Sequence, residues 1–220
     1  MDEMMMMVKL KAVAPPLSID ARLKLSSGMI ICGPSQGGKS MWCKHLIKCA
    51  NEVYDTPISK VYWYYGAIWS SHLLAFKDDA NVFIRQGIPE DRAEIDPYSL
   101  IVIDDNIKAD LSEIFSTWTH HIPCGAIKIT QNIYHKKTDR TTNICAQYLV
   151  LFKYPGDKMI IKTLASQMRK PWLTAAYDHA MIKPYSYLLI DLHQQTPESI
   201  RIRTNILPGE GLLTVYKEKR

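Results

Sequence analysis

The chain has 220 residues, of which 47% are hydrophobic, and its formal net charge is +5. This length and composition are typical of a globular protein with one substantial core. No apolar run approaches the ~20 residues that a membrane-spanning helix needs, so no membrane span is expected. The five cysteines include no C-x-x-C pair, which favours a reduced, intracellular protein over a disulfide-linked secreted one. The modest positive charge permits contact with nucleic acid without requiring it.

The predicted elements alternate between strands and helices. Residues 1–16 are expected to form a flexible arm, and residues 21–25 an edge strand. Further strands are predicted, from apolar, β-branched or aromatic content, over residues 29–32, 60–65, 81–85, 100–103, 126–130, 147–152, 186–190 and 200–206. Helical segments are predicted over residues 40–53, 70–76, 89–95, 110–122, 157–168 and 172–182. This alternation is typical of an α/β domain with a mostly parallel central sheet flanked by helices, here followed by a C-terminal hairpin.

One loop carries the strongest chemical signal. It matches the pattern G-x-x-x-x-G-K-[ST] in full, between a predicted strand and a predicted helix, and its residues are Gly33, Pro34, Ser35, Gln36, Gly37, Gly38, Lys39 and Ser40. Glycines let successive backbone N–H groups turn toward phosphate oxygens, and the helix that follows points its positive end at the same charge. Lys39 is expected to reach the β- and γ-phosphates, and the Ser40 hydroxyl to bind Mg²⁺. The sequence therefore predicts a P-loop that binds ATP with Mg²⁺.

A second signal lies at the end of the apolar run over residues 100–103, where Asp104 and Asp105 follow directly. After a P-loop on the same chain, the first acid is expected to hold the Mg²⁺ shell and the second to orient or deprotonate the attacking water. The alternative is an N-cap, because aspartates often begin a helix after a strand. Gln131 ends the next strand, where its amide could contact the γ-phosphate or the water. Arg140 lies in a predicted polar loop, where it could stabilise charge in a neighbouring subunit's site, or it could be an ordinary surface arginine.

The aromatic strand over residues 60–65 also has two readings. Its rings could stack on nucleic-acid bases, or they could pack beneath a helix. Packing is the favoured interpretation, since aromatic residues are common in buried strands.

These motifs together resemble a known group of proteins. The P-loop, the segment over residues 100–106, the segment Ile127–Asn132 with Arg140, and the strand over residues 147–153 are similar to the FtsK–HerA superfamily, and most of all to genome-packaging ATPases of double-stranded DNA viruses. The segments over residues 187–192 and 201–205 resemble the versions found in Polinton- and adintovirus-type elements. The resemblance covers roughly residues 17 to 211, expected to be one ATPase domain, with residues 212–220 as a tail.

The resemblance implies a RecA-like sheet in which the strand ending at Gln131 lies between the P-loop strand and the Asp104 strand. It implies a homo-oligomeric ring of five or six subunits, with ATP bound between neighbours, that moves duplex DNA into a preformed capsid. Gln131 then matches the polar sensor, and Arg140 the trans arginine finger. Asp105 replaces the glutamate that many members carry there. The implied partners are double-stranded DNA and capsid or portal-vertex proteins. The implied location is the infected host cell, in the nucleus or the cytoplasm, and also the virion if the protein stays associated with it.

Other functions remain open from the sequence. A P-loop nucleoside or nucleotide kinase would transfer the phosphate to an acceptor instead of water. An assembly factor could bind ATP and change shape without hydrolysing it. A cellular HerA-like translocase is a closer alternative, which the small size and the virus-type tail disfavour.

Overall fold

The structure is a computed structural model, and it describes residues 10–16, 18–66, 71–104, 109–133 and 139–218. Its strands are β1 (Leu10–Val13), β2 (Ser27–Cys32), β3 (Lys60–Tyr65), β4 (Val82–Gln86), β5 (Ser99–Asp104), β6 (Cys124–Thr130), β7 (Ala146–Phe152), β8 (Tyr187–Asp191), β9 (Ile202–Thr204) and β10 (Thr214–Glu218). Its α-helices are α1 (Lys39–Lys48), α2 (Ala50–Val53), α3 (Thr119–His121), α4 (Asp139–Cys145), α5 (Met159–Gln167) and α6 (Leu173–Ala180). Short 3₁₀ helices are η1 (Ser71–Phe76), η2 (Arg92–Glu94) and η4 (Glu198–Ile200), and η3 (Ile114–Trp118) is a π-helix that runs into α3.

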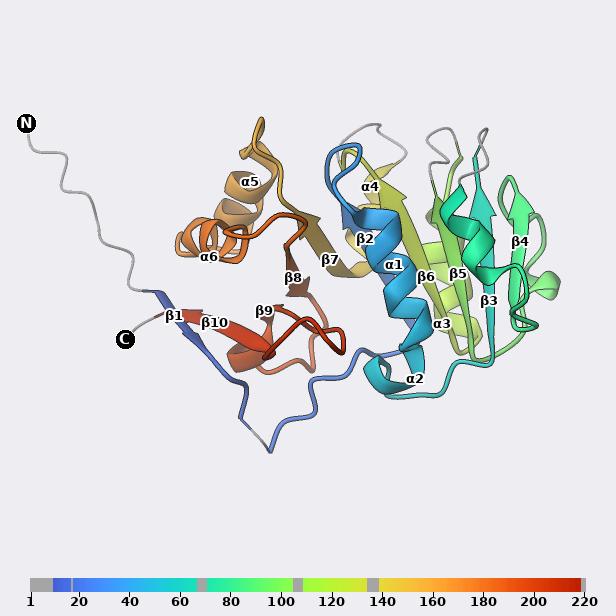
Figure 1. The fold of residues 1–220 in the computed structure, drawn as a ribbon, viewed down its shortest axis with the longest axis horizontal. Helices are drawn as coiled ribbons and strands as arrows, with labels where there is room; N and C mark the ends of the chain where they lie inside the picture. The colour runs from blue at the N-terminus through green and yellow to red at the C-terminus, as the bar shows by residue number, and fades with distance from the viewer. Residues whose placement is uncertain (1–9, 17, 67–70, 105–108, 134–138, 219–220) are drawn as a thin grey trace, which may run out of the picture.

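All ten strands form one sheet in the order β1-β10-β9-β8-β7-β2-β6-β5-β3-β4 (Figure 1). The strands from β7 to β4 are parallel to one another. Beyond β7 the sheet continues antiparallel, through β8, β9, β10 and β1. The predicted α/β class with a mostly parallel sheet is confirmed, and the predicted C-terminal hairpin is the β8–β9 pair. The implied order is also confirmed, because β6 lies between the P-loop strand β2 and the Asp104 strand β5.

The core has two layers because the sheet is covered on both faces. Side chains alternate along β2, and all six of its residues are buried, as expected for a parallel strand covered on both faces. Met29 and Ile31 pack on the face covered by α1, α2 and η1. Ile30 and Cys32 pack on the other face, with η3, α5 and α6. Each fully buried aliphatic side chain contributes about 1.5–3 kcal/mol, so the apolar run largely fixes the position of the loop that follows it.

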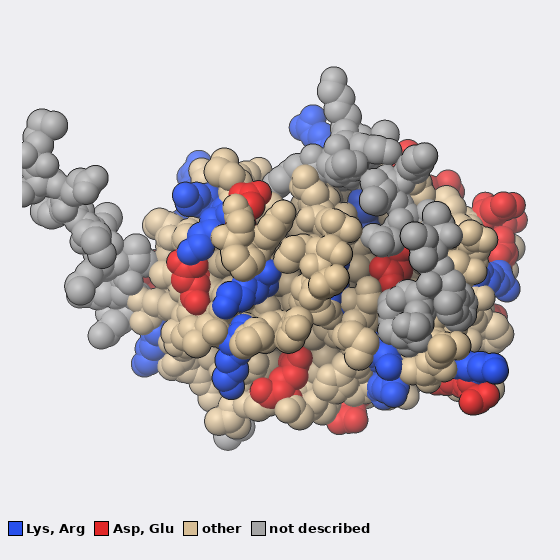
Figure 2. Space-filling view, turned by 45° about the horizontal axis from the view of Figure 1, so that its top comes forward, with Lys and Arg blue, Asp and Glu red and all other residues tan. Residues whose placement is uncertain are grey.

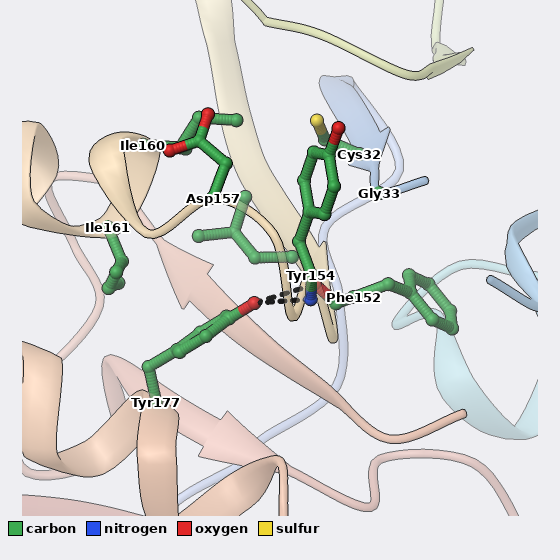
Figure 3. A pocket seen from close by; sticks show the side chains of 9 residues that line it. Cys32, Gly33, Phe152, Tyr154, Asp157, Ile160, Ile161 and Tyr177 are labelled. Atoms are coloured by element: carbon green, nitrogen blue, oxygen red, sulfur yellow. Dashed lines mark hydrogen bonds between the residues drawn. The ribbon is translucent and has the colours of Figure 1, made fainter. Parts of the chain in front are cut away.

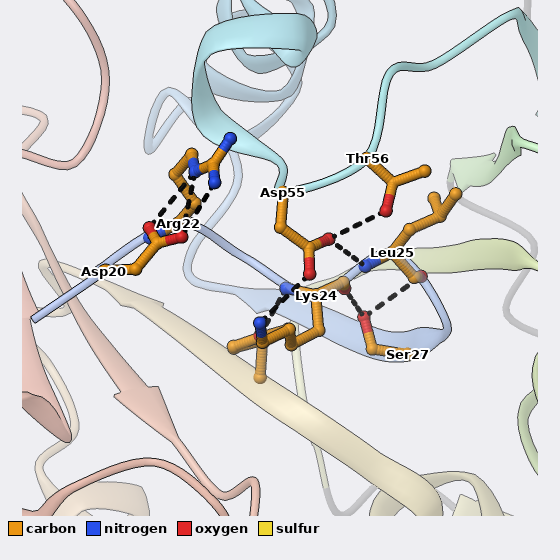
Figure 4. Close-up of polar contacts among 8 residues, drawn as sticks. Asp20, Arg22, Lys24, Leu25, Ser27, Asp55 and Thr56 are labelled. Carbon is orange, nitrogen blue, oxygen red and sulfur yellow. Dashed lines mark hydrogen bonds and ion pairs between the residues drawn. The ribbon is translucent and has the colours of Figure 1, made fainter.

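The segment before β2 differs from the prediction. Residues 21–25 form no strand of the sheet, and Leu23 makes only an isolated bridge to Tyr54. The Asp55 carboxylate explains this, because it accepts hydrogen bonds from the Leu25 amide at 3.3 Å and from Lys24 Nζ at 3.0 Å (Figure 4). The chain entering β2 is therefore held against the end of α2, and its backbone groups are used there.

The two ends of the chain also differ from the prediction. Part of the predicted arm is strand β1, and part of the predicted tail is strand β10. They pair in register from Leu10 opposite Glu218 to Val13 opposite Val215. Both strands are short, and neither carries the alternating pattern that identifies a strand in isolation.

The segment that includes Arg140 was expected to be a polar loop, but residues 139–145 form helix α4, in which Thr142 is 1% exposed. The aromatic strand is β3, and Tyr62, Trp63 and Tyr64 are all buried in the core. Their rings therefore pack inside the domain, as the favoured interpretation had it, and are not available to stack on bases.

Candidate nucleotide-binding site

The glycine-rich loop lies at the carboxyl end of β2 and leads into α1 (Figure 1). The Gly33 amide donates to the Thr130 carbonyl at the end of β6, at 3.3 Å. Gly38 has φ of 93°, a left-handed conformation that strains residues with a Cβ. Helix α1 begins directly after it, with the Trp42 amide donating to the Gly38 carbonyl at 2.9 Å. The loop therefore takes the strand–turn–helix form that directs backbone N–H groups and a helix N-terminus to one place.

The next two residues, Lys39 and Ser40, bring a charged group and a hydroxyl group to the start of α1. Lys39 is 9% exposed, and its Nζ donates to the Pro34 carbonyl at 2.8 Å, so the amine lies over the loop's own backbone. The Ser40 hydroxyl donates to Asp104 Oδ1 at 3.5 Å. Asp104 is the last residue of β5 and is 8% exposed. Two residues far apart in the sequence thus meet at the edge where the parallel strands end.

The donor atoms of this pair suit Mg²⁺. A hydroxyl oxygen and a carboxylate oxygen are hard ligands of the type that this ion prefers, and Mg²⁺ is usually held by only one or two protein groups plus water and phosphate. The separation of 3.5 Å between the two oxygens is short enough for one ion to contact both. Ser40 and Asp104 therefore fit the metal role that the sequence predicts for them.

The other predicted site residues are less closely placed. Gln131 follows β6 directly, next to the residue that contacts Gly33, and it is exposed. Arg140 lies in the first turn of α4 and is exposed, with no ion pair to any described residue. Asp105 lies outside the described residues. The structure thus brings together the P-loop, Ser40 and Asp104, and puts Gln131 at the neighbouring strand end.

An open pocket of about 590 Å³ adjoins the P-loop and was not anticipated from the sequence. Residues 36–41 form one side of it, and the side chains around the rest are Trp42, His45, Phe152, Tyr185 and Glu210. Tyr185 and Glu210 lie more than 140 residues beyond the loop in sequence. No motif marks them, and the only available signal is a tyrosine beside Pro184 in a segment without regular structure.

The opposite side of the loop is supported by a hydrogen-bonded tyrosine. Tyr177 of α6 donates its hydroxyl proton to the Phe152 carbonyl at 2.9 Å and accepts from the Tyr154 amide at 3.0 Å (Figure 3). This fixes the end of β7, where the Phe152 Cβ would be 2.6 Å from any Cβ added at Gly33. A small cavity of about 20 Å³ remains between β7 and α5. The end of β7 therefore packs closely against the start of the loop, with little empty space between them.

The thiols near the loop are held in their protonated form. Burial raises the pKa of Cys32 to about 11, and burial also raises the pKa of Cys43 well above its usual range. Because the thiolate is the reactive form, burial disfavours a nucleophilic role for these cysteines near neutral pH.

The surface charge does not mark a nucleic-acid face by itself. On the face shown in Figure 2, basic and acidic side chains are interspersed. One of the basic residues near α6, Lys170, is paired with Glu198 at 2.7 Å. No described helix is long and apolar enough to cross a membrane.

The fold is shared with viral genome-packaging ATPases of known structure. The chain matches the genome packaging NTPase B204 from Sulfolobus turreted icosahedral virus 2 in complex with ATP-gammaS, at TM-score 0.51 and 14% identity, over 84% of this chain and 97% of B204. The complex of the same NTPase with AMPPCP gives TM-score 0.54 and 13% identity, over 89% and 99%. B204, the DNA-packaging ATPase from Sulfolobus Turreted Icosahedral Virus, gives TM-score 0.52 and 14% identity, over 90% and 100%. No protein-family model and no curated protein sequence matches the chain.

These similarities establish the class of fold. The chain has the P-loop ATPase fold of viral genome-packaging NTPases, as the resemblance in its motifs implied. At 13–14% identity the likeness shows the fold and leaves the activity to be argued from the site.

Proposed function

We propose that this protein is a Mg²⁺-dependent ATPase motor that moves viral double-stranded DNA into a preformed capsid. The observation that carries the proposal is the contact of Ser40 with Asp104 beside a complete P-loop, on a fold shared with packaging NTPases. The motor is a homo-oligomeric ring of five or six subunits that works with capsid or portal-vertex proteins. It acts inside the infected host cell, in the nucleus or the cytoplasm, and can remain with the virion.

The chemistry follows from the groups around the loop. Backbone N–H groups of Gly38, Lys39 and Ser40, at the N-terminus of α1, bind the phosphate oxygens, and Lys39 places its charge on the β- and γ-phosphates. Ser40 and Asp104 would hold Mg²⁺, which when bound neutralises charge on the phosphate oxygens. Water attacks the γ-phosphorus, the bond to the bridging oxygen breaks, and ADP and phosphate leave.

Three further residues act on that water and on the developing charge. Asp105 orients the water and takes its proton, and Gln131 contacts the γ-phosphate or the water from the end of β6. Arg140, exposed at the start of α4, supplies a positive charge to the site of a neighbouring subunit. An arginine used in this way accelerates phosphoryl transfer by about 10³–10⁵-fold, so an isolated subunit is expected to hydrolyse ATP slowly.

The test is ATP turnover at several protein concentrations, with and without long duplex DNA. Turnover per subunit should rise with both, and Lys39→Ala should abolish it. Arg140→Ala mixed with wild type should poison the ring, whereas Arg92→Ala should not, because the exposed Arg92 lies in η2, beside β4 at the far edge of the sheet.

Three results would contradict parts of this function. Turnover independent of concentration and DNA would show a site complete within one chain. Phosphate transfer to a nucleotide acceptor would indicate a kinase. Tight ATP binding without turnover, under conditions in which a ring forms, would indicate a nucleotide-gated assembly factor.

A further inference from the structure

The pocket beside the P-loop lies on the side of the loop opposite to the expected metal and terminal phosphate. Ser40 and Asp104 meet on the side of the loop that faces β6 and β5, which is where the metal and the terminal phosphate belong. Phe152, at the end of β7, and Tyr185, just before β8, lie on the opposite side, since β7 and β8 follow β2 in the other direction. A nucleotide whose terminal phosphate lies near Asp104 would therefore extend its base toward this pocket.

The pocket is continuous with the phosphate-binding loop. Residues 36–41 line it, and these include Lys39 and Ser40. Its volume of about 590 Å³ falls within the ~300–1,000 Å³ usual for small-molecule sites. Its far walls are formed by Trp42 and His45 of α1 and by Tyr185 and Glu210 of the C-terminal region.

Tyr185 offers an aromatic ring to this space. It is 70% exposed, which is unusual for a large aromatic side chain, and its backbone has φ of 59°. A left-handed conformation at a residue other than glycine costs on the order of 1 kcal/mol and is common at ligand sites. The ring is seated over the loop, because its Cδ1 atom would lie 3.2 Å from a Cβ added at Gly38. An exposed ring held beside a phosphate-binding loop is a suitable stacking surface for a base.

Glu210 offers one carboxylate oxygen. Its Oε2 accepts from the Tyr187 hydroxyl at 2.5 Å and from the Leu207 amide at 3.0 Å, so the side chain is held in one orientation. Neither of these two hydrogen bonds uses Oε1. The indole of Trp42, which is only 6% exposed, lies beside the Glu210 carboxylate and interacts with it. The pocket therefore contains a carboxylate oxygen that a ligand could contact, surrounded by aromatic side chains.

We propose that this pocket binds the base of the bound nucleotide and selects adenine. Tyr185 stacks on the ring, and Glu210 Oε1 accepts a hydrogen bond from the 6-amino group. The proposal rests on the P-loop binding a nucleoside triphosphate, as proposed above. It adds a base-recognition site made by two residues of the C-terminal region, and it predicts discrimination against purines that carry an oxygen at position 6.

The substitution Glu210→Gln should reverse this discrimination. The Leu207 amide is a fixed donor, so it should hold the oxygen of the glutamine amide as it holds Oε2 of the glutamate. The –NH₂ group would then face the pocket, where it can donate to a 6-oxo group but cannot accept from a 6-amino group. Glu210→Gln is therefore expected to favour hypoxanthine over adenine.

The experiment compares ligands that the enzyme cannot turn over. Isothermal titration calorimetry with Mg²⁺ measures the Kd of ADP, IDP and pyrophosphate for each variant. ADP carries the 6-amino group, IDP has oxygen there, and pyrophosphate has no base. Wild type should bind ADP about 10–150-fold more tightly than IDP, the range expected for a hydrogen bond to a charged group. Glu210→Gln should bring this ratio to one or below.

Tyr185→Ala tests the stacking surface. It should weaken ADP binding about 5–150-fold, from the usual contribution of one base–aromatic stack, and change pyrophosphate binding less than about twofold. The matched control is Tyr98→Ala, because Tyr98 has the same φ of 59° and is 50% exposed, but precedes β5 at the amino end of the strands. Tyr98→Ala should change neither affinity.

The outcomes separate the two proposals. If wild type binds pyrophosphate as tightly as ADP, or if Tyr185→Ala weakens both ligands equally, the base pocket is wrong while the P-loop site stands. If ADP and IDP bind equally to wild type, adenine selection by Glu210 is wrong. If Lys39→Ala binds pyrophosphate as well as wild type does, the phosphate site itself fails, and with it the proposed function.

Discussion

The buried ion pair between Asp191 and Arg203 should be the most sensitive electrostatic contact for stability. Asp191 ends β8, Arg203 lies in β9, and Arg203 Nη2 is 2.9 Å from Asp191 Oδ2. The two side chains are 4% and 1% exposed. Arg203 Nε and Nη1 have no hydrogen-bond partner among the described residues, and burial lowers the pKa of this guanidinium. The charge of Arg203 is therefore compensated chiefly by one carboxylate.

Asp191→Asn removes that compensation with little change of shape. The new side chain can still accept from the His193 amide and the Thr196 hydroxyl, as Oδ1 does now at 3.1 and 2.9 Å. The buried guanidinium is then unpaired, which costs about 3–5 kcal/mol. For a chain of this size, 1 kcal/mol corresponds to about 2–4 °C, so Tm should fall by about 6–20 °C.

The assay is thermal and urea unfolding followed by circular dichroism. The matched control is Asp178→Asn, which breaks the pair of Asp178 with Lys158 at 2.6 Å, where the side chains are 49% and 47% exposed. That change should cost less than about 1 kcal/mol, because solvent screens exposed pairs. The double variant Asp191→Asn with Arg203→Met should recover much of the loss. A loss below about 1 kcal/mol for Asp191→Asn, or one equal to the control, would refute this reasoning.

Three further predictions concern the support of the site. Tyr177→Phe leaves the backbone groups at the end of β7 without their hydroxyl partner and should lower the free energy of unfolding by about 1–3 kcal/mol in urea titrations. Gly28→Ala puts a Cβ 2.4 Å from the Phe115 ring and should cost about 1–3 kcal/mol or more by the same measurement; no change would show that η3 yields freely. Burial raises the pKa of Glu210 above the usual 4.5, so the folded protein keeps a proton that the unfolded chain has lost. Stability should therefore fall as pH rises from about 4.5 through the folded pKa, and Glu210→Gln should remove that fall; a profile identical in both proteins would contradict it.

The central strands could be predicted because their sequence signal is local. The apolar runs that became β2, β5 and β7 were located to within one or two residues, since strands covered on both faces need continuous hydrophobic side chains. The P-loop was equally clear, because a left-handed backbone at Gly38 and a helix starting at Lys39 are consequences of the residues themselves.

The edges of the sheet could not be found in this way. Strands β1 and β10 are short and show no regular alternation of apolar and polar residues, and each is stabilised by pairing with the other across nearly the whole chain. The residues of α4 have no apolar period, so their sequence predicts a loop, and the helix depends on packing against η3 and β2. Where pairing or packing with a distant segment supplies the stability, the local sequence gives little indication of the secondary structure.

The sequence by itself determined the phosphate-binding loop, the acid at the end of β5, and the alternation of strands and helices. Only the tertiary structure decided which of these groups meet. The contact of Ser40 with Asp104 depends on β6 lying between β2, which leads to Ser40, and β5, which ends at Asp104. The position of Tyr185 and Glu210 beside the P-loop depends on the sheet turning antiparallel beyond β7. The physical reason is that backbone conformation follows from neighbouring residues, whereas the position of a distant side chain follows from how the whole sheet pairs and packs.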